Sequence, residues 1–267
     1  TWGVAYSKQS KKVFASAFVK RHVGLGVLGS GGIYMLEPTG TTFNVTPFFD
    51  MDNNSFNTAS IPVTRTRAAS TPLYGVGTSF TISQAKIATY LGANDPLTGK
   101  PSGLGVLGTN SERGLGTLST STDYDPAAFD QVGKLGLGGL EISDDGLYLF
   151  VMNLYSKKVF RLTLNDANNP TSGVAITSYS LPTVSVVNGE LRPFALKYAN
   201  GKLYVGAVAS GESSPTDVNT NLRGYVFQLD NANSAASFSV APILDFPLDY
   251  QKGTSDGGVT GIFWKPW

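Results

Sequence analysis

The sequence has no cysteine, a single histidine and few charged residues. Without cysteine the chain cannot form disulfides, thiolate nucleophiles or Cys-based zinc sites, so its stability must come from core burial. Charged residues make up 15% of the chain, against about 25% in an average soluble protein. The net charge of +1 gives no field that would hold a polyanion, and we expect no nucleic-acid partner. No apolar run reaches the roughly eighteen residues of a membrane-spanning helix, and we expect no membrane span.

The polar character of the chain comes instead from serine, threonine, asparagine and glycine. Its 31 glycines suit the positive φ angles of turns, and its 12 tyrosines favour pleated surfaces. This composition is typical of many short strands joined by turns and predicts an all-β fold. All-β domains reach 267 residues without a break, so we expect one domain over residues 1–267.

Three hairpins of one design carry the strand signal. In each, two apolar segments flank a short polar turn, and the Asp-Asp-Gly turn at residues 144–146 is a strong hairpin signal because glycine tolerates positive φ. A third and a fourth strand follow each hairpin. The expected groups are 3–6, 13–19, 32–37 and 45–50; then 140–143, 147–152, 158–164 and 176–181; then 194–198, 203–208, 223–230 and 241–246.

An apolar hairpin followed by a third strand and a more polar fourth strand is the order of a propeller blade. The sequence therefore predicts a β-propeller of four-stranded antiparallel sheets. At roughly 45 residues a blade, the chain would hold about six blades or form a fragment of a larger propeller. We expect a divergent blade within residues 58–125, where the pattern weakens.

Two short repeats support internal duplication. Ser-Lys-Lys-Val-Phe occurs at residues 10–14 and 156–160, and Gly-Leu-Gly-Val-Leu-Gly occurs at 24–29 and 103–108. The glycine repeat has the spacing of a dinucleotide fingerprint, but its first copy precedes an expected strand where that mechanism needs a helix N-terminus. It therefore indicates a turning loop.

Candidate site residues fall into two groups. Arg21, His22, Arg113, Arg192 and Glu212 lie in loops or at strand ends that a propeller would bring to one rim, where they would bind a ligand or form an ion pair. The acidic loop of Asp123, Asp125 and Asp130 has alternating carboxylates that suit Ca²⁺, although it lacks the glycine and distal glutamate of an EF-hand. We expect no other cofactor.

Several segments together resemble a known family. They are FVKRHVG at 18–24 with GIY at 32–34, VGKLGLGGL at 132–140 with MNL at 152–154, and RPFALK at 192–197 with GKLYVG at 201–206. These segments resemble the propeller-like region near the start of large bacterial cell-surface proteins, in which serine-aspartate-repeat-type adhesin modules follow.

The resemblance implies export to the cell surface and a role in adhesion, motility or envelope architecture. It brings no catalytic residues. Some relatives carry cysteines near the equivalent of Ala209, and no disulfide of theirs can form in this chain. In these relatives another blade follows the tryptophan-rich segment at 264–267, so we expect the chain to be cut from a longer one.

Two functions from different classes remain open. The first is an extracellular binding, adhesion or structural module with a protein or carbohydrate partner, or with self-association in a surface assembly. The second is a propeller hydrolase or lyase supported by Ca²⁺ in a central channel. They differ in whether carboxylates and the histidine converge from different blades.

Overall fold

The computed structural model describes residues 2–51, 79–81, 104–106, 131–214, 219–253 and 262–266. These ranges hold seventeen β-strands and one 3-10 turn, Gly29–Gly31, and no α-helix. The prediction of an all-β chain is confirmed. In the described part, no helix has the length and hydropathy that a membrane span requires.

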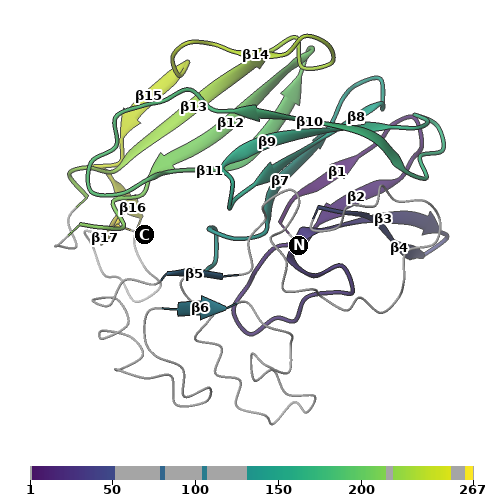
Figure 1. Cartoon of the computed structure of the whole chain (residues 1–267), viewed down its shortest axis with the longest axis horizontal. Coiled ribbons are helices and arrows are strands. Elements are labelled where there is room, and N and C mark those ends of the chain that lie inside the picture. Colours follow the sequence, from purple (N-terminus) through teal and green to yellow (C-terminus); the bar gives the residue numbers. More distant parts are fainter. Residues whose placement is uncertain are drawn as a thin grey trace.

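Three antiparallel sheets dominate the fold, and in each one the strands follow the order of the chain (Figure 1). The first sheet contains β1 (Val4–Tyr6), β2 (Val13–Ser16), β3 (Gly32–Thr39) and β4 (Thr42–Asp50). The second contains β7 (Leu137–Ile142), β8 (Tyr148–Asn153), β9 (Lys158–Leu164) and β10 (Gly173–Ser180).

The third sheet has five strands because β13 pairs with two short outer strands, one along each half of its length. It contains β11 (Leu191–Ala199), β12 (Lys202–Ala209), β13 (Arg223–Asp230), β14 (Ser237–Phe238) and β15 (Leu244–Pro247). Two small ladders complete the described strands: β5 (Ser79–Thr81) with β6 (Leu104–Val106), and β16 (Gln251–Gly253) with β17 (Ile262–Phe263).

The repeated pentapeptide forms the same local structure twice. In both copies the first lysine, Lys11 or Lys157, has a φ of 57° at or just after a turn, and a strand follows, from Val13 in the first copy and from Lys158 in the second. The strands differ in position, because β2 is the second strand of its sheet and β9 is the third. The repeat is therefore a turn-and-strand unit and not a marker of equivalent blade positions.

The second sheet is buried on both faces. Successive side chains of a strand point to opposite faces, and in β8 Leu149 and Val151 pack against the first sheet while Phe150 and Met152 pack against the third. This double burial explains why the sequence runs apolar without alternation from residue 147 to residue 152.

Close backbone contacts join the first strands of the three sheets, and β7 lies between β1 and β11 (Figure 1). A Cβ atom on Gly3 would lie 2.4 Å from the carbonyl oxygen of Gly138, and one on Gly139 would lie 2.6 Å from the amide nitrogen of Leu196. Glycine is needed at both points because no side chain fits. The first and second sheets thus meet directly, although residues 51–136 separate them in the sequence. The divergent blade was expected within residues 58–125, and most of that range lies outside the described residues.

Candidate functional site

The predicted site residues fall partly within the described ranges. Arg113 and the acidic loop of Asp123, Asp125 and Asp130 lie outside them. Arg21 and His22 form a turn after β2, where the Val23 amide donates to the Lys20 carbonyl at 3.3 Å and His22 is exposed with a φ of 62°. Arg192, at the start of β11, and Glu212, just after β12, meet directly.

Arg192 and Glu212 form a two-pronged ion pair. Arg192 Nη2 donates to Glu212 Oε1 at 2.6 Å, and Nε donates to Oε2 at 3.1 Å. Their side chains are only 10% and 13% exposed. This parallel geometry fixes the guanidinium plane as well as the charge. Of the five predicted rim residues, the structure brings these two together.

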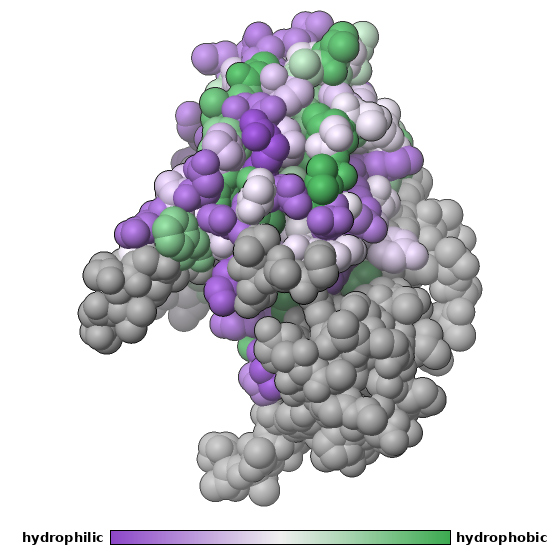
Figure 2. Space-filling model, turned by 90° about the vertical axis from the view of Figure 1, so that its left-hand side faces the viewer, coloured by the Kyte–Doolittle hydropathy of each residue, from purple (hydrophilic) through white to green (hydrophobic). Residues whose placement is uncertain are grey.

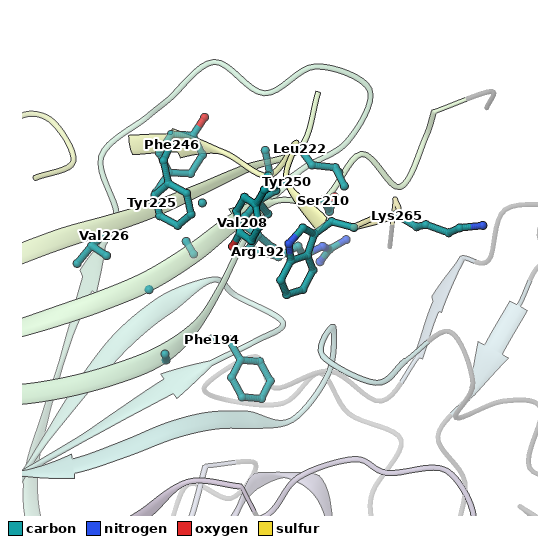
Figure 3. Close-up of a pocket in the computed structure, with 17 residues that line it drawn as sticks. Arg192, Phe194, Val208, Ser210, Leu222, Tyr225, Val226, Phe246, Tyr250 and Lys265 are labelled. Carbon is teal, nitrogen blue, oxygen red and sulfur yellow. The ribbon is translucent and has the colours of Figure 1, made fainter. Parts of the chain in front are cut away.

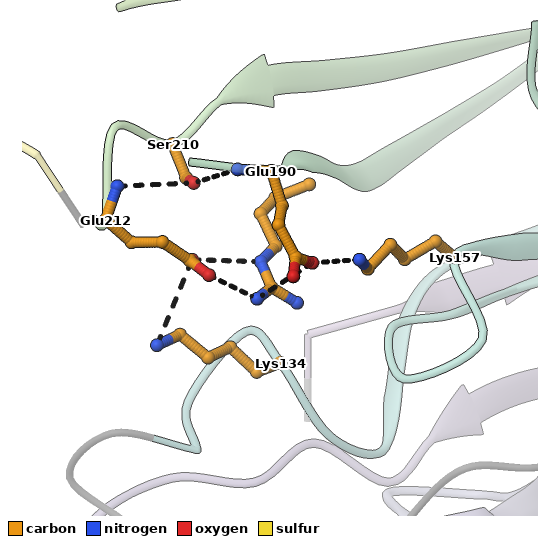
Figure 4. Close-up of polar contacts among 6 residues, drawn as sticks. Lys134, Lys157, Glu190, Ser210 and Glu212 are labelled. Carbon is orange, nitrogen blue, oxygen red and sulfur yellow. Dashed lines mark hydrogen bonds and ion pairs between the residues drawn. The ribbon is translucent and has the colours of Figure 1, made fainter. Parts of the chain in front are cut away.

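Three further charged side chains extend the pair into a network (Figure 4). Lys134 Nζ lies 3.9 Å from Glu212 Oε2, and Arg192 Nη2 lies 3.2 Å from Glu190 Oε2. Glu190 also pairs with Lys157. Because Lys134 precedes β7 and Lys157 follows β8, the network ties one end of the second sheet to the third sheet.

The network keeps Glu212 ionised. Burial alone would raise the pKa of Glu212, but the hydrogen bonds and charge of Arg192, together with Lys134 and Ser210, outweigh it and hold the pKa below its ordinary value. Ser210 Oγ accepts the Glu190 amide hydrogen at 3.0 Å, which fixes the backbone beside the pair. A carboxylate with a lowered pKa and a locked partner is suited to holding the sheets together and is a poor proton donor.

A cavity of about 630 Å³ lies over the face of the third sheet that does not pack on the second sheet. Figure 3 shows Phe246, Tyr225 and Tyr250 gathered on one side of it and Phe194 apart from them. Its walls are mainly apolar, and Arg192 and Ser210 lie at its edge. The rings of Tyr250 and Trp264 meet edge to face at 6.2 Å, with exposed fractions of 48% and 37%.

Sequence reasoning missed this cavity. The aromatic segment around Trp264 is the signal for it in the sequence, but the pattern alone predicts only that another blade follows. Figure 2 views the molecule from the side on which β15 lies in Figure 1, and hydrophobic residues are visible there among polar ones.

A smaller, more polar cavity of about 340 Å³ lies where β1, β7 and β11 end. Tyr6, Gln9 and Asp144 line it together with an ion pair between Lys197 and Glu141, whose nitrogen and oxygen lie 3.3 Å apart. The Lys197 side chain is exposed, so this pair is screened by water and adds little stability.

Within the described ranges, no three His, Cys, Asp or Glu residues lie close enough together to hold a metal ion. The acidic loop is outside those ranges, so the calcium site stays a prediction.

No family model matches the chain. The chain is 22% identical over 257 residues to Colossin-D of Dictyostelium discoideum, a match that covers 96% of this chain and 20% of Colossin-D. The chain therefore spans about a fifth of the length of this relative and is similar to one region of a much larger protein.

Proposed function

We propose that the chain is a protein-binding and assembly module of a larger cell-surface protein, built from propeller-type sheets. Each main sheet contains an antiparallel four-stranded meander in the order of the chain, to which the third sheet adds β15, and the first strands of the three sheets lie side by side. Both features are those of propeller blades arranged around an axis. The sequence resemblance supports the surface location, and the match to a fifth of Colossin-D supports a place within a larger protein.

The observation that carries this proposal is the aromatic cavity on the face of the third sheet that does not pack on the second sheet. Protein interfaces are enriched in tyrosine, tryptophan and phenylalanine at their centres, and a few such residues supply most of the binding energy. Tyr250 and Trp264 stand half-exposed at the cavity, while Phe246 and Val208 form its floor and walls. An apolar side chain of a protein partner fits such a cavity.

The charged groups near the cavity support binding better than catalysis. Arg192 is held by Glu212, and the lowered pKa of Glu212 keeps this carboxylate ionised. The network therefore fixes one edge of the cavity and offers no proton to a substrate. A rigid edge of this kind reduces the ordering cost of binding.

A random-peptide display library tests the proposal. The chain is immobilised at a density low enough to keep single copies apart, and bound peptides are sequenced. We expect an enriched peptide family with apolar or aromatic anchors. Its affinity should fall at least about tenfold with Tyr250→Ala or Trp264→Ala, in keeping with the loss of a central interface residue.

The matched control is Val240→Ala. Val240 is apolar and 97% exposed, and it does not line the cavity. Its removal should leave peptide binding unchanged. Peptides that bind all variants equally, or the absence of any enriched family, would contradict the proposal.

A further inference from the structure

Side chains from all three main sheets line the smaller cavity of about 340 Å³, which we call the polar cavity. The turn after β1 contributes Lys8 and Gln9, the end of β7 contributes Glu141, and β11 contributes Lys197 and Tyr198. Every lining residue belongs to the described ranges, and none of them also lines the aromatic cavity. The polar cavity is therefore separate from the proposed protein-binding site.

Hydrogen-bonded turns frame the polar cavity. Gln9 Nε2 donates to the Asp144 carbonyl, which ties the hairpin turn of the first sheet to that of the second. Next to Asp144, Ser143 Oγ accepts the Tyr148 amide hydrogen at 3.0 Å, and the Ser143 amide donates to the Tyr148 carbonyl at 2.9 Å. These contacts hold the lining residues in place before a ligand binds, which lowers the ordering cost of binding.

The volume and polarity of the polar cavity select the class of ligand. Small-molecule sites in proteins measure about 300–1,000 Å³, so this cavity suits a small molecule or one terminal unit of a longer one. Such sites are usually lined by apolar side chains, whereas this lining is mainly polar. Because each polar group that loses water on binding needs a new partner, the ligand must carry hydrogen-bonding groups over most of its surface.

The charges of the lining cancel one another. Lys8 and Lys197 supply two positive charges, and Glu141 and Asp144 supply two negative charges. A lining without net charge gives no strong field that would concentrate an anion or a cation. The site therefore favours a neutral ligand. A neutral molecule that carries hydroxyl groups around its whole edge is a carbohydrate.

The Glu141–Lys197 pair has hydrogen-bonding capacity to spare. Lys197 Nζ lies 3.3 Å and 3.4 Å from the two carboxylate oxygens of Glu141, whereas a tight charge-assisted bond measures about 2.7–2.9 Å. The ammonium group has three donors, and the carboxylate has about four acceptor sites. Two neighbouring hydroxyl groups of a sugar can therefore bridge the pair, one donating to Glu141 and the other accepting from Lys197.

Tyr6 supplies an aromatic wall of the polar cavity. It is the last residue of β1, it lines the cavity, and it is 55% exposed. The face of an aromatic ring is negative, so it attracts the weakly positive C–H groups on the flat side of a sugar ring. Tyr6 can thus contact the face of a sugar while the ion pair binds hydroxyl groups at its edge.

We propose that the polar cavity binds a neutral carbohydrate whose ring packs on Tyr6 and whose hydroxyl groups bond to Glu141 and Lys197. This goes beyond the proposed protein-binding function, because it gives the chain a second site for a partner of different chemistry. The volume of about 340 Å³ lies at the lower end of the range for ligand sites, so the terminal sugar of a longer glycan should determine the affinity.

An array of neutral oligosaccharides tests the proposal on the whole chain. The array displays glycans that end in glucose, galactose, mannose or N-acetylglucosamine, and each glycan that binds is then titrated as a free sugar by calorimetry. We expect at least one terminal sugar to bind. Its dissociation constant should rise at least about tenfold with Tyr6→Ala or with Glu141→Gln, the loss expected for a central aromatic contact or a hydrogen bond to a charged group.

Tyr155→Ala is the matched control. Tyr155 is 46% exposed and lines neither cavity, so its replacement should leave carbohydrate binding unchanged. Tyr6→Phe keeps the aromatic ring and should bind as the wild type does. The inference is overturned if no neutral glycan binds, if only charged sugars or free amino acids bind, or if Tyr6→Ala binds as tightly as Tyr155→Ala.

Peptide binding and carbohydrate binding are separate measurements. Because no residue lines both cavities, Tyr6→Ala should leave peptide binding unchanged, and Trp264→Ala should leave carbohydrate binding unchanged. A chain that selects peptides but binds no neutral glycan refutes only this inference. A chain that binds the glycan but selects no peptides refutes only the protein-binding function.

Discussion

Replacing Glu212 with glutamine removes one charge from the network that joins the second and third sheets. Arg192 and Lys134 then keep two positive charges whose side chains are each only about 10% exposed. Breaking a buried ion pair by removing one partner costs about 3–5 kcal/mol. The glutamine oxygen can still accept one hydrogen bond and the network lies at the end of the sheets, so we expect a loss of about 2–3 kcal/mol in the free energy of unfolding.

The same variant has a defined pH dependence. The pKa of Glu212 is lower in the folded chain than in the unfolded chain, where it takes its ordinary value of 4.5. The ionised carboxylate therefore contributes its full stability above pH 4.5, and this contribution is lost as the pH falls through the lower pKa of the folded state. The difference between wild type and Glu212→Gln should shrink as the pH is lowered from 7 to 3.

Urea unfolding followed by tryptophan fluorescence at both pH values measures this difference. Lys202→Gln is the control, because it breaks an exposed pair with Asp230 whose nitrogen and oxygen lie 3.1 Å apart; exposed pairs contribute about 1 kcal/mol or less. A Glu212→Gln effect no larger than that of the control, or one that is equal at pH 7 and pH 3, would refute the reasoning.

Three other predictions concern the packing of the sheets and the metal. Phe150 is fully buried and stacks on Tyr198 at 5.7 Å, so Phe150→Ala should cost about 3–5 kcal/mol in urea unfolding; a loss under about 1 kcal/mol would show that the second and third sheets do not pack as described. Gly139→Ala forces a Cβ against the Leu196 amide and should cost about 1–3 kcal/mol, and an unchanged midpoint would contradict that close approach. Excess Ca²⁺ should raise the thermal midpoint by several degrees over a chelator if the acidic loop binds the ion, and no shift would exclude this site.

The sequence predicted the local part of the fold well. Hairpin strands and turns depend on neighbouring residues, and the Asp145–Gly146 turn forms as expected, with Gly146 at a φ of 75° and the Leu147 amide donating to Asp145 Oδ1 at 3.0 Å. The predicted second strand of the first sheet, 13–19, is shorter in the structure because beyond Ser16 the chain turns to the second sheet, where Ala17 accepts a bond from the Leu137 amide. That contact joins residues far apart in the sequence, so no local pattern could reveal it.

In the candidate site, too, the sequence predicts what depends on neighbouring residues and does not predict the contacts between distant ones. Arg192 and Glu212 could be predicted to share one rim because they flank the two strands of a single hairpin, but their two-pronged geometry and the lysines from the second sheet could not. The cavity depends on Tyr250 and Trp264 reaching the face of β12 and β13. The segments that meet there are distant in sequence, so the aromatic residues were visible and their common surface was not.

The low proportion of charged residues in the chain has a structural explanation in the packing of its sheets. A single sheet with one solvated face alternates apolar and polar residues, whereas a sheet packed on both sides needs apolar residues on both. The second sheet is packed on both sides, by the first sheet on one face and by the third sheet on the other, and it carries apolar residues on both faces.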